Sequence, residues 1–231
     1  MVYFMLVFCD VIYSNLDLWL LILTFCMIYL YKNDLPDGFL RTTKNSVAID
    51  TETMGLMPHR DRLCLAQFSL GDGNAYLVQF FEYSKAQNIR QILSDAQILK
   101  IFHYARFDML MLYKYLGVMT KNVYCTKIAS KLSRTYAQNH GLLDLCKEVL
   151  DVEISKEQTC TDWGKENLTE EQKEYAANDV LYLHKLKDEL DLLLKREGRL
   201  ELAQSCFNFL ETRVQLDLMA GENYDVFAHG A

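Results

Sequence analysis

The sequence has few of the features that would place it outside the ordinary globular proteins. Its 231 residues contain only two prolines, Pro36 and Pro58, and show no low-complexity tract or internal repeat. Disordered linkers, collagen-like chains and repeat solenoids are therefore excluded, because each of these needs such a composition. With 51% apolar residues, a chain of this length fits one domain built around one core.

Basic residues are also in deficit. Lys and Arg number 24 against 31 Asp and Glu, which gives a formal charge of −7. This balance argues against a general nucleic-acid coat protein, because such proteins are usually basic. It remains compatible with an enzyme whose carboxylates hold metal cations.

Paired cysteine motifs are missing as well. The seven cysteines are an odd number, and none of them forms a C-x-x-C pair. We therefore expect scattered reduced thiols rather than a disulfide framework or a zinc site, which favours a cytoplasmic protein.

The first 26 residues contain no Lys or Arg at all, yet they are strongly apolar. The uncharged run from Leu18 to Tyr31 is 14 residues long, whereas a membrane-spanning helix needs about 20. No basic residue precedes the run and no signal-cleavage pattern follows it. Three interpretations stay open: a membrane anchor formed by residues 1–31, a buried N-terminal helix, or a natural start at Met27. We prefer the last, so stable membrane association is not favoured and the folded domain is expected to cover residues 27–231.

The remaining pattern predicts strands first and helices later. Strands are expected at 28–31, 47–50, 63–70, 75–81 and 98–102, with a short one at 123–124. Helices are expected at 87–93, 107–116, 127–132 and 142–150, then a long one opened by a capping box at 169–172, and a last one ending near 218. This order predicts an α/β fold with a mixed sheet of about five strands, flanking helices and a helical C-terminal part.

Three acidic constellations could carry chemistry. Asp50 and Glu52 end a buried strand, where residues two apart project to one face. Asp108 follows another buried strand and could simply cap a helix. Tyr175 and Asp179 lie four apart on the long helix, which places them on one face. Each signal alone is weak, but four carboxylates together suit two Mg²⁺ or Mn²⁺ ions, because these cations prefer oxygen ligands.

These three segments resemble the exonuclease motifs of the DEDD superfamily, tyrosine subtype, and in particular the ribonuclease D-like exonuclease domain. The resemblance runs from about residue 28 to 195. It also covers the segments 62–67, 125–130 and 168–177 and the residue Trp163. It implies a ribonuclease H-like fold and a 3′→5′ exonuclease that releases 5′-nucleoside monophosphates.

The resemblance also implies roles for the acidic residues. Asp50, Glu52 and Asp179 would hold the ion that activates water, and Asp50 would bridge to a second ion. Asp108 would serve that second ion, partly through water, and Tyr175 would position the attacking water. His103 would support Asp108 or the terminal nucleotide, although a packed core histidine is an equal alternative.

One feature departs from full-length ribonuclease D, which has helical nucleic-acid-binding domains after the nuclease. Here about 35 residues follow position 195, too few for a further domain. Lys127, Lys131 and Arg134 fall on one expected helical face, where they would contact backbone phosphates; a plain solvated face is the alternative. The predicted partner is a nucleic acid 3′ end, with RNA favoured over DNA. A catalytically inactive binding module is the alternative function, and the oligomeric state cannot be read from the sequence.

Overall fold

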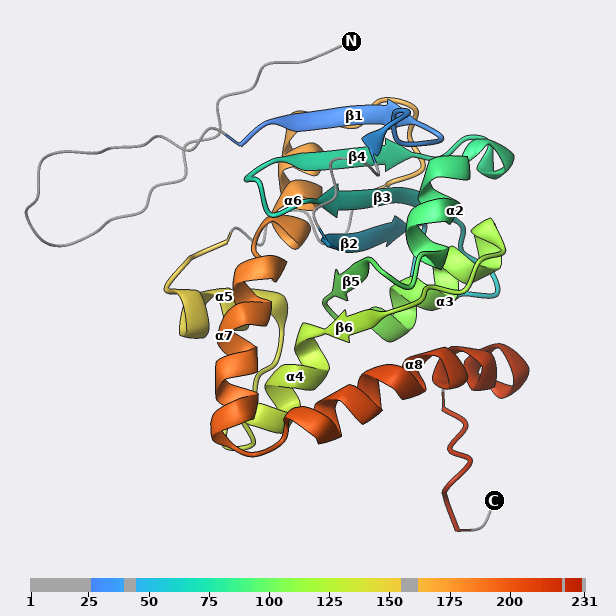
Figure 1. Ribbon diagram of the computed structural model, residues 1–231. Coiled ribbons are helices and arrows are strands. Elements are labelled where there is room, and N and C mark those ends of the chain that lie inside the picture. Colours follow the sequence, from blue (N-terminus) through green and yellow to red (C-terminus); the bar gives the residue numbers. More distant parts are fainter. Residues whose placement is uncertain (1–25, 40–44, 155–161, 222, 230–231) are drawn as a thin grey trace, which may run out of the picture.

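A computed structural model describes residues 26–39, 45–154, 162–221 and 223–229 of the chain (Figure 1). The expected N-terminal extension therefore lies outside the described residues, except for Cys26. Among the helices that the structure describes, none is both long enough and apolar enough to cross a membrane. The five cysteines in the described ranges are free thiols, as the sequence predicts.

Six strands form one mixed sheet in the order β1-β4-β3-β2-β5-β6. Their bounds are β1 Ile28–Lys32, β2 Ser46–Thr53, β3 Leu63–Ser69, β4 Ala75–Gln79, β5 Leu99–Phe102 and β6 Val123–Cys125. The α/β class with a mixed sheet is confirmed, but the sheet has six strands rather than about five. The sixth strand, β6, is the short strand expected at 123–124, and it pairs in parallel with β5 at the edge of the sheet.

The two strands that pair with β2 follow it over different lengths, and this difference leaves part of one edge of β2 unpaired near the centre of the sheet. β3 runs antiparallel to β2 along its whole course, from Ala48 opposite Ser69 to Thr53 opposite Leu63. The parallel partner β5 pairs with β2 only from Ser46 to Ala48. The second half of β2 therefore has an open edge, beside the point where the chain leaves β5.

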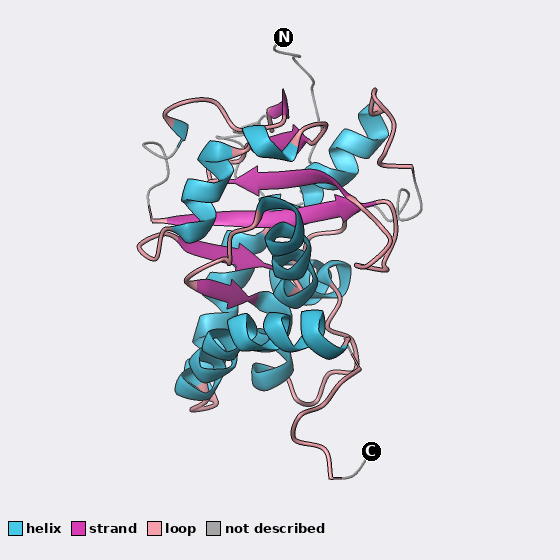
Figure 2. Ribbon diagram, turned by 90° about the vertical axis from the view of Figure 1, so that its right-hand side faces the viewer, coloured by secondary structure: helices cyan, strands magenta, loops and turns pink. Residues whose placement is uncertain are grey.

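Helices lie on both faces of the sheet (Figure 2). Their bounds are a 3-10 turn η1 Tyr83–Lys85, α2 Gln87–Ser94, α3 Ala105–Leu116, α4 Thr126–Ser133, α5 Leu142–Leu150, α6 Glu170–Leu181, α7 Leu183–Arg196 and α8 Leu200–Ala220. α6 packs on β2, β3 and β4, while α3 packs on β2, β3, β5 and β6. α4, α7 and α8 pack against one another beyond β6, so the helical C-terminal part is confirmed (Figure 1).

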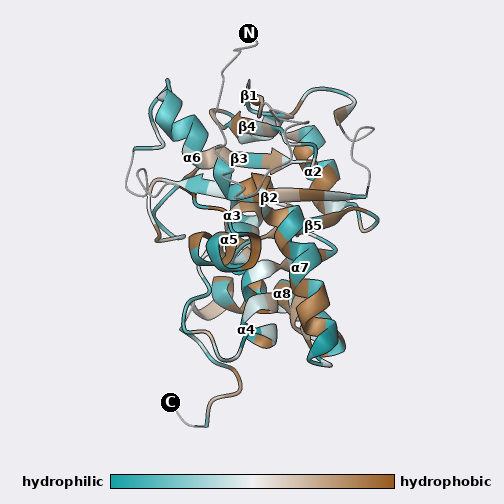
Figure 3. Ribbon diagram, turned by 90° about the vertical axis from the view of Figure 1, so that its left-hand side faces the viewer, coloured by the Kyte–Doolittle hydropathy of each residue, from teal (hydrophilic) through white to brown (hydrophobic). Residues whose placement is uncertain are grey.

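The predicted single long helix is in fact two helices. The capping box is present in full, with the Thr169 side chain accepting from the Gln172 amide and the Gln172 side chain accepting from the Thr169 amide. The helix then turns at Tyr182, because α6 packs on the sheet whereas α7 packs on α4 and α5. No Gly or Pro marks this break, so the sequence pattern could not show it. An apolar stripe of Leu183, Leu186, Leu190 and Leu194 is buried on α7, and hydrophobic and hydrophilic segments alternate along the helix (Figure 3).

Candidate active site

Two carboxylates project from one face of β2. Asp50 and Glu52 lie two residues apart in a regular strand, so their side chains point to the same side of the sheet. Thr51 between them points to the opposite side. The hydrophobic residues Val47, Ala48 and Ile49 are fully buried and anchor the strand, so the acidic pair is held on a rigid element.

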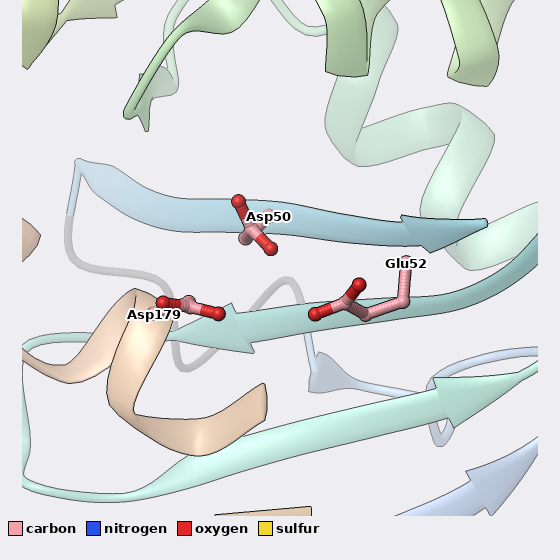
Figure 4. Close-up of side chains that lie close together, drawn as sticks. All are labelled: Asp50, Glu52 and Asp179. Carbon is pink, nitrogen blue, oxygen red and sulfur yellow. The ribbon is translucent and has the colours of Figure 1, made fainter. Parts of the chain in front are cut away.

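A third carboxylate comes from α6. Asp179 lies in the last part of this helix, whose small residues Ala176 and Ala177 are buried and allow it to approach the sheet closely. Ligand oxygens of Asp50, Glu52 and Asp179 all lie within 4.8 Å of one another, and Figure 4 shows the three carboxylates converging from β2 and α6. Segments about 130 residues apart in the chain therefore meet at one point.

The fourth carboxylate comes from α3 and lies outside the group of three, although its charge acts on Asp50. Tyr104 adopts a left-handed conformation (φ 65, ψ 43), and this turn starts α3 at Ala105, beside the open edge of β2. Asp108 therefore lies within the first turn of the helix, and it is Tyr104, without a side-chain hydrogen bond, that occupies the N-cap position. The Asp108 side chain is buried and its Oδ1 accepts a hydrogen bond of 2.6 Å from the Thr51 hydroxyl. Helix capping does not account for its position.

Thr51 is a site residue that the sequence analysis did not single out. The family resemblance offers His103 as a residue that would support Asp108, whereas in the structure the side chain that bonds Asp108 is Thr51. Strand alternation alone places Thr51 on the face of the sheet opposite to Asp50 and Glu52. The sequence does not show that the helix carrying Asp108 packs there.

Burial and mutual repulsion dominate the electrostatics of the cluster. Burial raises the pKa of Asp50 well above its ordinary value, and the charges of Asp108, Asp179 and Glu52 raise it further. The pKa of Glu52 is raised in the same way, by burial first and then by Asp179 and Asp108. Burial raises the pKa values of Asp108 and Asp179 to about 7. Four like charges in one place are unfavourable unless cations lie between them.

The donor set fits a hard divalent cation. It consists of carboxylate oxygens, the ligands that Mg²⁺ and Mn²⁺ prefer, without a thiolate or imidazole in the converging group. Cation binding would also relieve the repulsion among these buried carboxylates, since a bound cation favours the ionised form of each of them.

These pKa shifts predict how the stability of the metal-free protein depends on pH. A raised carboxyl pKa in the folded state contributes stability that is present below the unfolded value near pH 4. That contribution is lost as the pH rises through about 7, where Asp108 and Asp179 ionise. We expect the Tm in EDTA to fall by about 5 °C or more between pH 5 and pH 8. Mn²⁺ should raise the Tm much more at pH 8 than at pH 5, as thermal unfolding would show, and an equal rise at both pH values would contradict the assignment.

Tyr175 lies one helical turn before Asp179 on α6, as the spacing predicts. Its half-buried ring packs against the buried Trp163, with ring centroids 6.2 Å apart at an angle of 42°. Trp163 precedes α6 in the chain, so the contact ties the segment before this helix to the site helix itself. The ring position of Tyr175 is therefore fixed by packing as well as by its helix.

His103 stays neutral and faces α4 rather than the carboxylates. Its Nδ1 lies 2.9 Å from the Thr126 hydroxyl oxygen. Burial, aided by the positive charge of Lys127, lowers the pKa of His103 to about 3. An imidazole with this pKa carries no charge at neutral pH, so His103 provides no cationic contact for a phosphate.

The three basic residues expected on one helical face do not share it. Lys127 and Lys131 line a groove of about 440 Å³ between α3, α4 and α8, where the Lys127 ammonium lies 4.5 Å from the ring centroid of Tyr104. Arg134 is only 3% exposed, and its guanidinium donates to Ser130 Oγ and pairs with Glu148. It follows the last residue of α4, where the backbone leaves helical geometry and turns the side chain inward.

Comparison with known proteins agrees with this geometry. Residues 27–195 match the 3'-5' exonuclease family, and the chain belongs to that family. The chain is 30% identical over 139 residues to ribonuclease D of Desulfotalea psychrophila, a match that covers 60% of this chain and 37% of that protein. The chain therefore spans well under half the length of that relative.

Solved structures are similar over more of the chain. NrnC of Brucella melitensis bound to pGG superimposes with a TM-score of 0.84 at 50% identity, covering 89% of this chain and all of that one. NrnC of the same organism with bound Mg²⁺ superimposes with a TM-score of 0.82 at 51% identity, covering 88% and 99% of the two chains. The predicted family, the ribonuclease H-like fold and the 3′→5′ exonuclease class are confirmed.

Proposed function

We propose that this protein removes nucleotides from the 3′ end of RNA by a two-metal-ion mechanism and releases 5′-nucleoside monophosphates. Single-stranded DNA is the alternative substrate. The observation that carries the proposal is the convergence of Asp50, Glu52 and Asp179 within 4.8 Å, with Asp108 held beside them. Two similar structures add support, because one is described as bound to pGG and the other as bound to Mg²⁺.

Each carboxylate has a role that its position suits. Two divalent ions would stabilise the charge that develops on the phosphodiester and lower the pKa of the attacking water. Asp50, Glu52 and Asp179 would hold one ion, Asp50 would also face the second, and Asp108 would serve the second partly through water. Thr51 would keep the Asp108 carboxylate in place through its hydrogen bond. Tyr175 would orient the attacking water from the adjacent helical turn.

A cleavage assay with the full chain tests the proposal. Single-stranded RNA and DNA labelled at the 5′ end would be incubated with Mg²⁺, Mn²⁺ or EDTA and resolved on a gel. We expect a ladder that shortens from the 3′ end only when metal is present, and that is stronger on RNA. Tight binding without any cleavage under either metal would instead indicate a catalytically inactive binding module.

Lys127 is half-exposed and Lys131 is exposed in the groove between α3, α4 and α8, and we propose that they contact backbone phosphates. Reversal of both charges to Glu should weaken RNA binding and reduce the salt dependence of the affinity. Each lost phosphate contact lowers the slope of log K against log salt by about 0.7 on a single strand. The slope should therefore fall by about 1.4, which fluorescence anisotropy at several salt concentrations would measure.

The matched control is a double reversal at Lys185 and Lys195, two exposed residues on α7 that do not line the groove. It makes the same change in net charge, so a general electrostatic effect would appear equally in both variants. Equal salt slopes for the two double variants would assign Lys127 and Lys131 to an ordinary solvated surface.

A further inference from the structure

One buried polar residue is not explained by the packing around it. Gln67 stands in the middle of β3, all seven residues of which are buried, and its own exposure is 0%. Neither its side-chain oxygen nor its side-chain nitrogen has a hydrogen-bond partner within the described parts of the chain. A buried amide without partners costs free energy, and native proteins retain few of them. An apolar residue of the same size would avoid this cost.

The position of Gln67 connects it with the carboxylate cluster. In the antiparallel β2–β3 pair, Gln67 lies directly opposite Asp50. Directly opposite residues project to the same face, with Cβ atoms about 4.5–5.5 Å apart, and a glutamine side chain can span that gap. The neighbour of Gln67 on its other side is Leu77 of β4, which offers no polar side-chain atom. α6, which carries Asp179, covers this part of β3.

A second buried glutamine shows what a locally satisfied amide looks like. Gln79 on β4 is 3% exposed, and its Nε2 donates a hydrogen bond of 2.6 Å to the carbonyl oxygen of Lys165. Its burial is therefore explained by a backbone partner. Gln67 differs from it in having Asp50 as the polar group next to it in the sheet.

We propose that Gln67 is a positioning residue of the metal site, whose side-chain N–H donates to the Asp50 carboxylate when cations are bound. This inference rests on the proposed function. Carboxylates that ligate metals are themselves held by such hydrogen bonds, which fix their orientation. The unsatisfied amide then has a partner in the loaded protein.

The test compares Gln67→Met with Gln79→Met in the full chain, using titration calorimetry with Mn²⁺ and thermal unfolding in EDTA. Methionine keeps the volume of glutamine and removes its hydrogen bonds. We expect Gln67→Met to unfold in EDTA at the same or a higher temperature than the parent, and to bind Mn²⁺ about tenfold more weakly or worse. Gln79→Met should unfold at a lower temperature and bind Mn²⁺ as the parent does.

A loss of Mn²⁺ affinity below threefold in Gln67→Met overturns the inference, because a residue that only packs would leave the binding constant unchanged. If Gln67→Met does not fold, Gln67→Asn replaces it, since this variant keeps the amide but shortens its reach, and the same threefold limit applies. If the parent itself shows no saturable Mn²⁺ binding, the proposed function fails and this inference falls with it. Parent-like binding by the variant would defeat this inference alone.

Discussion

Asp50→Asn is expected to lower the rate of 3′-end cleavage by about 10³-fold or more while leaving the protein folded. The change removes one negative charge and keeps the shape of the side chain. Asp50 belongs to the group whose oxygens converge within 4.8 Å, and it also interacts electrostatically with Asp108. In the proposed mechanism Asp50 is a ligand shared by both ions, so its loss would remove several kcal/mol of transition-state stabilisation, and about 4 kcal/mol corresponds to that factor. Cleavage of labelled RNA under saturating Mn²⁺ measures it.

The same variant should be more stable than the parent in the absence of metal at pH 8. Burial and three neighbouring carboxylates disfavour the ionised form of Asp50, so a neutral amide relieves part of the repulsion. Loss of activity with an unchanged or higher Tm in EDTA would separate a catalytic defect from a folding defect. Glu189→Gln makes the same chemical change at an exposed position on α7 and should alter neither quantity. Near-parental turnover by Asp50→Asn would mean that the catalytic centre lies elsewhere.

The positions of the site carboxylates could largely be predicted from the sequence, because local geometry determines them. Strand alternation puts Asp50 and Glu52 on one face, and helical spacing puts Tyr175 and Asp179 on one face. Family resemblance then supplied the missing step, that these segments meet. The structure brings three of the four carboxylates within ligand distance of one another.

What could not be predicted depends on tertiary packing. The bond between Thr51 and Asp108 exists because β5 stops pairing with β2 at Ala48 and leaves an edge open to α3. A periodic pattern reports which face of an element is apolar, but it does not report where a neighbouring strand ends. The inward turn of Arg134 has the same origin, since its partner Glu148 lies on a helix 14 residues away.

Tyr175 presents the clearest division between a packing role and a chemical role. Its ring contacts Trp163, and this contact would survive in phenylalanine. The spacing of four residues places Tyr175 on the same face of α6 as Asp179. Removal of the hydroxyl alone therefore separates the two roles without creating a cavity in the core.

Tyr175→Phe is expected to slow turnover by about 10²-fold or less, with little change in KM or in the Tm. A group that orients water or handles its proton contributes about 10²–10⁴-fold, and a residue that acts beside metal ions belongs at the low end of that range. Because the hydroxyl would act on water rather than on the nucleotide, the loss should fall on kcat, which steady-state kinetics on a short RNA would resolve. Tyr76→Phe removes a hydroxyl that bonds Asp72 in an exposed turn, so it controls for the chemical change alone. If both variants match the parent in kcat, Tyr175 serves only to pack α6 against Trp163, and the attacking water is oriented by the carboxylates themselves.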